Sequence, residues 1–132
     1  MILKEIYNLK EDLNRIKFIQ EASSDKNSFA GYKTENGLLF GTSEWFNAIE
    51  TGIIPKQTIK GNISRIIMSG HNDFPEFEIK TKTEISIWEK KGVDEEYEIG
   101  KYVELTYVKQ KYKKPTSLLG AVSKCIIKIK IC

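Results

Sequence analysis

The stretch QTIKGNISRIIM, residues 57–68, marks the point where the periodicity of the chain changes from helical to alternating. Ile59, Gly61 and Ile63 fall on one face of an extended chain, and the polar residues between them fall on the other face. The phase of the apolar positions shifts at Ile66, and such a shift predicts a β-bulge. We therefore expect this stretch to form the first strand of a sheet.

Alternation between apolar and polar residues continues after this stretch and predicts four further strands. In the third of the five strands, the alternation places Ile85 and Ile87 inward and Ser86 and Trp88 outward. The four further strands are predicted at residues 76–82, 84–90, 101–114 and 123–132.

The N-terminal residues 1–24 show a helical period instead. Apolar residues recur there at spacings of four and three, and they would form one stripe on a helix. Such a stripe packs against its own domain or forms the seam of a homodimer, and both alternatives stay open at this point. The stripe consists of Ile2, Ile6, Leu9, Leu13 and Ile16.

The segment from residue 28 to residue 54 predicts a hairpin followed by a short helix. The Asn-Gly pair at residues 36–37 suits a tight turn between two extended segments. Thr42, or the serine after it, is able to cap the helix, and Trp45 and Ile49 lie one turn apart on its buried face.

The strand pattern of residues 57–131 resembles the oligonucleotide/oligosaccharide-binding fold, the OB-fold. The resemblance rests on a glycine and a bulge in the first strand, a hairpin between the second and third strands, and the entry IGKYVELTY (residues 99–107) to the fourth. An SH3-like or other small barrel is the alternative, because residues 90–98 are too few for the helix that many OB barrels carry there. We expect residues 1–132 to form a single α+β domain, in which an N-terminal helix, a hairpin and a short helix pack on a five-stranded, mainly antiparallel OB-like barrel.

Composition narrows the class of protein. The chain has 132 residues, of which 40% are hydrophobic and 30% charged, and these proportions are typical of a soluble globular domain. Its apolar runs are too short to span a membrane, and its N-terminus lacks the pattern of a signal peptide, so we expect a cytoplasmic protein with no membrane partner. The two cysteines, Cys125 and Cys132, supply neither a disulfide framework nor a metal site. No cofactor is expected.

Charge is distributed unevenly along the chain. Residues 101–132 contain eight lysines and one glutamate, a net charge of +7, whereas residues 1–100 contain 13 basic and 17 acidic residues, a net charge of −4. A basic C-terminal quarter with interleaved tyrosines favours binding to nucleic acid, with single strands preferred. The alternative is a protein-interaction or adaptor module that docks an acidic protein partner, with a homodimer formed through the N-terminal helix as a further option.

The nucleic-acid hypothesis assigns its contacts to aromatic side chains for base stacking and to basic side chains for phosphates. Trp88 has an alternative role, because it could instead pack under the N-terminal helix. The predicted nucleic-acid-binding residues are Lys60, Arg65, Trp88, Lys109, Lys111, Tyr112, Lys113, Lys114, Lys128 and Lys130.

An enzymatic function has little support in the sequence. His71 and Asp73 lie in the segment SGHNDFPEFE and would be the candidates for a hydrolase or nuclease, but their spacing supplies neither three metal ligands nor a partner for the histidine. Phosphate-binding loops and serine-elbow motifs are missing as well. We therefore expect turn formation around His71, no catalytic residue and no bound metal.

Overall fold

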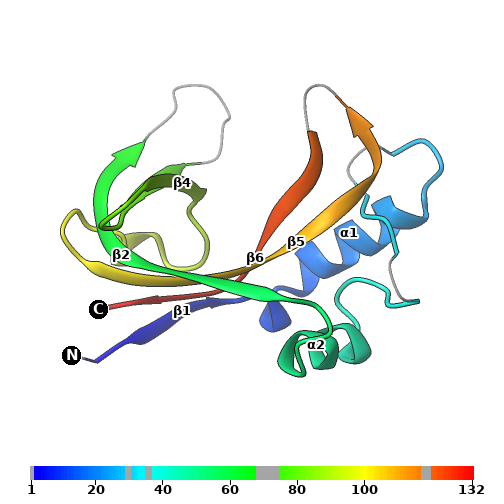
Figure 1. Cartoon of the computed structure of the whole chain (residues 1–132), viewed down its shortest axis with the longest axis horizontal. Coiled ribbons are helices and arrows are strands. Elements are labelled where there is room, and N and C mark those ends of the chain that lie inside the picture. The colour runs from blue at the N-terminus through cyan, green and yellow to red at the C-terminus, as the bar shows by residue number, and fades with distance from the viewer. Residues whose placement is uncertain (1, 29–30, 35–36, 68–74, 117–119) are drawn as a thin grey trace. The chain divides into compact units, whose positions relative to one another are not determined.

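The computed structural model describes residues 2–28, 31–34, 37–67, 75–116 and 120–132. It is an α+β structure, as predicted, with two α-helices and one six-stranded sheet (Figure 1). The strand order is β1-β6-β5-β2-β3-β4, and the pairs β1–β6, β2–β3 and β3–β4 are antiparallel. The elements are β1 (Lys4–Asn8), α1 (Leu13–Ser24), α2 (Ser43–Glu50), β2 (Lys56–Ile67), β3 (Glu76–Lys80), β4 (Ile85–Glu89), β5 (Tyr102–Thr116) and β6 (Gly120–Ile131), with 3-10 turns at Leu9–Glu11 and Asp94–Glu96.

The chain divides into two compact units. Three strands, β2, β5 and β6, contribute residues to both. Unit 1 consists of Met1–Asn8, Thr58–Thr106 and Ile127–Cys132, and unit 2 consists of Leu9–Gln57 and Tyr107–Ile126.

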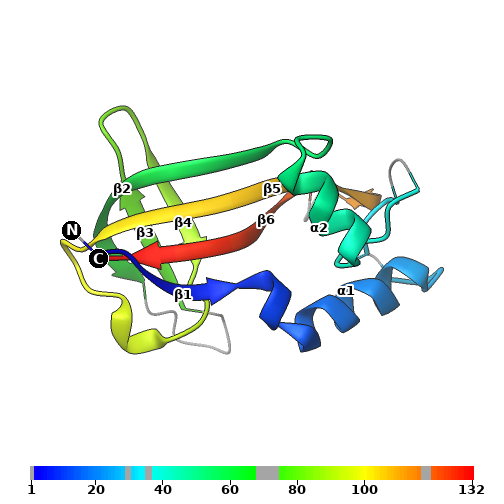
Figure 2. The ribbon, with the colours of Figure 1, turned by 90° about the horizontal axis from the view of Figure 1, so that it is seen from below.

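The sixth strand is β1, and it replaces the first part of the helix predicted over residues 1–24. β1 pairs with the edge of β6, from Lys4 opposite Ile131 to Asn8 opposite Lys128 (Figure 2). The prediction of five strands was therefore wrong, because the free edge of β6 offers backbone hydrogen bonds that a helical period in the sequence does not reveal. The OB-like character of the barrel, and the choice between it and an SH3-like barrel, stay predictions.

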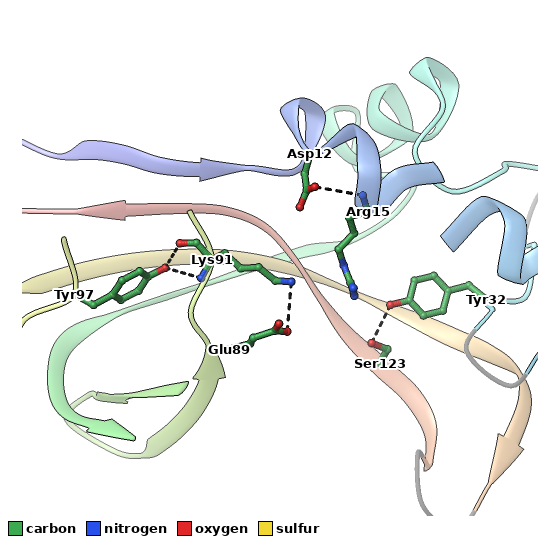
Figure 3. Close-up of polar contacts among 7 residues, drawn as sticks. All are labelled: Asp12, Arg15, Tyr32, Glu89, Lys91, Tyr97 and Ser123. Atoms are coloured by element: carbon green, nitrogen blue, oxygen red, sulfur yellow. Dashed lines mark hydrogen bonds and ion pairs between the residues drawn. The ribbon is translucent and has the colours of Figure 1, made fainter. Parts of the chain in front are cut away.

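α1 begins much later than predicted, at Leu13. The Asp12 side chain caps it by accepting a hydrogen bond from the backbone N–H of Arg15 at 3.3 Å (Figure 3). The predicted apolar stripe does not form, since Ile2 is 87% exposed and Leu13 is 71% exposed. Of the five stripe residues, only Leu13 and Ile16 lie in α1, and the helix buries Ile16 together with Ile19 and Ala22.

In unit 1, β2 carries the predicted irregularity. Its register with β3 shifts between Ile63 and Arg65, slightly before the position expected from the sequence. Gly61 lies just ahead of this shift, where a Cβ atom would come within 2.4 Å of the Lys80 carbonyl oxygen. The absence of a side chain at residue 61 therefore allows the close approach of β2 to β3.

The faces of β4 are the reverse of those predicted. Ile85 and Ile87 are 59% and 49% exposed, whereas Trp88 is 5% exposed and lies opposite the fully buried Phe77. The indole N–H of Trp88 donates to Ser86 at 2.8 Å, so its polar atom is satisfied inside unit 1. Burying the large indole beside Phe77 outweighs burying the isoleucines, and one strand cannot bury both faces.

In unit 2, the predicted short helix is confirmed as α2. The Thr42 side chain accepts a hydrogen bond from the backbone N–H of Trp45, and both Trp45 and Ile49 are buried. An aromatic cluster extends from this helix, with ring centroids 4.6 Å apart for Phe40 and Trp45 and 5.3 Å apart for Phe40 and Tyr32.

The segment predicted as a hairpin pairs with β5 instead in the part that the structure describes. Tyr32 forms a single bridge with Tyr112, and the backbone N–H of Lys33 donates to the carbonyl of Lys111 at 2.7 Å. Gly37 has a φ of +70°, as the predicted turn requires. Asn36, its partner in the predicted turn, lies outside the described residues.

Candidate functional site

The last lysines of β5 hold the end of α1. The Lys113 ammonium donates to the backbone carbonyl of Ala22 at 2.6 Å and to that of Ser23 at 3.2 Å, and the Lys114 ammonium donates to the carbonyl of Lys26. The last turn of a helix has carbonyls without intrahelical partners and carries the negative end of the helix dipole. Lys113 therefore caps the end of α1, and Lys114 binds the segment that follows this helix, so both lysines have a structural role within unit 2.

The other predicted binding residues of unit 2 lie along β5. Tyr112 packs on Tyr32, with ring centroids 5.6 Å apart, in addition to the bridge between their backbones. Lys109 and Lys111 are exposed on β5. Tyr112 is half-buried.

The predicted binding residues of unit 1 have varied environments. Arg65 pairs with Glu78 at 3.0 Å, Lys128 pairs with Glu5 at 3.6 Å, and Trp88 is buried rather than outward-facing. Lys130 lies opposite the same Glu5 in the β1–β6 register and is half-buried, and Lys60 is exposed. Five of the ten predicted residues thus lie in each unit, and no single surface of either unit collects its five.

A groove of about 420 Å³ in unit 1 brings together lysines from β2 and from the turn after β3. We call it the basic groove. Lys60, Lys80 and Lys82 are all exposed along it. The first of these lysines is among the predicted binding residues, whereas the other two are not, although they lie close together in the motif KTK. The lining residues are Lys60, Gly61, Asn62, Ser64, Lys80, Thr81, Lys82 and Tyr102.

Two carboxylates near the basic groove are engaged with other partners. Glu78 accepts hydrogen bonds from the Ser64 hydroxyl at 2.9 Å and from Arg65 at 3.0 Å. Glu104 accepts one from the Tyr102 hydroxyl at 2.9 Å, and this bond raises the pKa of Tyr102. Across the described parts of the chain, no carboxylate lies within ion-pairing distance of the three groove lysines.

The exposed isoleucines of β4 continue the face that carries the groove. Ile85 lies directly opposite Lys80 in the β3–β4 register, and Ile87 lies opposite Glu78. Directly opposed residues project from the same face of a sheet. A basic area and an apolar area therefore adjoin on one face of unit 1.

Two buried tyrosines have structural hydrogen bonds (Figure 3). The Tyr97 hydroxyl donates to the Lys91 carbonyl at 2.5 Å and accepts from the Lys91 backbone N–H at 3.0 Å, while the Tyr32 hydroxyl donates to Ser123 at 3.1 Å. Burial raises the pKa of Tyr32 and of Tyr97 to about 12 in each case. Both tyrosines are therefore neutral donors at physiological pH.

The predictions about catalysis and metal binding are tested only in part. His71 and Asp73 lie outside the described residues. Among the residues that are described, no group of three histidine, cysteine or acidic side chains could hold a metal ion, and Cys125 and Cys132 are both free thiols. The described helices are all too short or too polar to cross a membrane.

Comparison with known proteins gives the family. A protein-family model described as immunity protein RhsI2 matches residues 3–132, whereas no curated protein matches the chain. The match overturns the prediction of nucleic-acid binding, because an immunity protein binds a protein toxin. It agrees with the alternative drawn from the charge distribution, a protein partner. Since the match covers nearly the whole length, the chain belongs to the RhsI2 immunity protein family.

Proposed function

We propose that this chain neutralises an Rhs toxin by binding it directly as a protein. The observation that carries the proposal is the family match over residues 3–132. Neutralisation by binding requires a surface complementary to the toxin and no catalytic group of its own. The proposal therefore suits a chain whose sequence contains no recognisable catalytic motif.

The surface features of unit 1 support a protein partner. Stable protein interfaces combine exposed apolar side chains with a polar and charged surround. Exposed isoleucines on β4 adjoin charged residues of β3, and this combination is of the kind that such interfaces use.

The test is protection followed by purification. The cognate Rhs toxin domain is expressed in bacteria with and without this chain, and growth is measured; an immunity protein of a different family serves as the control. We expect growth to be restored only by this chain, and a complex of the two proteins to be recovered by size-exclusion chromatography. Toxicity that persists in the presence of the chain, or protection without a complex, would contradict the proposal.

A further inference from the structure

We infer that the basic groove and the adjoining isoleucines of β4 dock an acidic segment of the toxin that also carries apolar side chains. This inference rests on the proposed function and specifies which surface performs it and what chemistry the partner brings. The surface lies entirely within unit 1.

The first argument is that the groove lysines differ from most other lysines of unit 1 in lacking acidic partners. Lys60, Lys80 and Lys82 make no ion pair with any carboxylate that the structure describes. Five lysines of the same unit do have such pairs, and these are Lys4, Lys90, Lys91, Lys101 and Lys128.

Charge repulsion gives the second argument. Like charges that line one groove repel each other, and the repulsion is relieved when an oppositely charged group enters. Glu84 lies two residues after Lys82 in the turn, but it does not line the groove and makes no ion pair with a groove lysine in the part of the chain that the structure describes. The compensating negative charge is therefore best supplied by another molecule.

The third argument concerns the polar side chains of the groove that already have hydrogen-bond partners within unit 1. The side-chain amide of Asn62 donates to the Gly100 carbonyl at 3.2 Å, and the Tyr102 hydroxyl donates to Glu104. The ammonium groups of the three lysines remain as the donors for a ligand. Ammonium donors pair with anionic acceptors, and in a protein partner these are the carboxylates of aspartate and glutamate.

The apolar part of the surface adds affinity beside this charge. Ile85 and Ile87 expose about half of their side chains on the same face, next to Lys80 and Glu78. Covering each of them would contribute on the order of 1 kcal/mol through burial of apolar area. An acidic segment with neighbouring apolar residues fits both parts of the surface.

A second copy of this chain fits the groove less well than a toxin segment does. The main acidic run of the chain, Asp94–Glu96, is already engaged within its own unit: Asp94 pairs with Lys90 at 3.0 Å, and Glu96 pairs with Lys4 at 2.8 Å. Self-association through this run would have to break those ion pairs. An acidic segment of the toxin is therefore a better occupant of the groove than the acidic run of a second copy.

The test compares two variants with the same change in net charge. In Lys80→Glu/Lys82→Glu the reversal is inside the groove, and in Lys17→Glu/Lys33→Glu it is at exposed lysines of unit 2. Binding of the purified cognate Rhs toxin domain is measured by biolayer interferometry, and the fold of each variant is checked by circular dichroism. We expect affinity to fall about tenfold or more for the groove variant and less than about threefold for the control. Lys80→Gln/Lys82→Gln should give an intermediate loss and serves if the reversal impairs folding.

Each other outcome has a definite meaning. Equal losses in both double variants would show a net-charge effect, and an unchanged affinity of the groove variant would show that the groove does not contact the toxin; either result overturns the inference while the proposed function stands. A self-association that the groove variant abolishes, with toxin binding unaffected, would assign the groove to a second copy and also overturn it. Wild-type chain that fails to bind the toxin would overturn both proposals.

Discussion

At the scale of single residues, Lys113 shows how a basic side chain in a lysine-rich stretch can have a structural role. Its ammonium reaches the carbonyls that end α1, although α1 and β5 are far apart in the sequence. Lys109, on the same strand, is exposed to solvent. Lysines that look equivalent in the sequence therefore differ in what their loss would cost.

Replacing Lys113 with methionine should lower the free energy of unfolding by about 1–2 kcal/mol, because the carbonyls of Ala22 and Ser23 lose a charged donor while the apolar stem is kept. Urea denaturation measures the change. Lys109→Met is the matched control, with an expected change below about 0.5 kcal/mol. Equal effects of the two substitutions would contradict the capping role.

Buried tyrosines give a prediction about alkaline pH. The pKa of Tyr97 is raised to about 12 in the folded state, compared with about 10 in an unfolded chain. Its contribution to stability is therefore fully present below pH 10 and is lost as the pH rises through about 12, because the unfolded state releases the proton first. We expect stability to decline over this window, and to decline less steeply in Tyr97→Phe.

Thermal unfolding followed at several pH values between about 8 and 12 measures this decline. Tyr97→Phe should also cost about 1–2 kcal/mol at neutral pH, because the Lys91 backbone loses its hydroxyl partner. A variant whose stability falls with pH as steeply as that of the wild type would contradict the assignment.

At the scale of elements, β4 shows what the local sequence pattern can and cannot predict. The alternation in EISIWEK predicts a strand correctly, and β4 is that strand. The pattern alone does not decide which face is buried, because isoleucine and tryptophan are both apolar and occupy opposite faces. The choice depends on Phe77, which lies opposite Trp88.

The assignment of faces in β4 is tested by two substitutions. Trp88→Ala should lower the free energy of unfolding by about 3–5 kcal/mol, because it leaves a cavity beside Phe77. Ile87→Ala should lower it by only about 1 kcal/mol, since about half of that side chain is already exposed. Chemical denaturation of both variants gives the values. A larger loss for Ile87→Ala than for Trp88→Ala would contradict the observed faces and support those predicted from the sequence.

At the scale of the whole molecule, the uneven charge of the chain agrees with binding to an acidic protein. The net charge is +3, and the last quarter of the sequence alone carries +7. In the structure, much of this charge has internal roles, as at Lys113, Lys114 and Lys128. At long range this charge would attract an acidic partner, and it would therefore affect the rate of association more than the final affinity.

Association of the whole chain with its toxin should accordingly slow as salt is added. We expect the association rate constant to fall about tenfold when the ionic strength rises from about 0.05 to 0.5 M, because screening shortens the reach of the field. Stopped-flow fluorescence at several salt concentrations measures this rate constant. A rate constant that is independent of salt would argue against an acidic partner surface.

The sequence by itself determined the features that depend on near neighbours along the chain. Alternation located β2 to β6, and a capping threonine before an amphipathic segment located α2. The charge count included a protein partner among its two alternatives, and the family match selects it. These signals are local because they arise from side-chain period and from hydrogen bonds within a few residues.

Only the tertiary structure decided the features that depend on groups distant in the sequence. β1 is a strand because the edge of β6 supplies its hydrogen bonds, and Lys113 caps α1 because β5 runs past the end of that helix. The basic groove exists because the pairing of β2 with β3 brings Lys60 near Lys80 and Lys82. The physical reason is the same in each case: hydrogen-bond partners, burial and charge neighbours are fixed by pairing between segments, and no single segment encodes its partner.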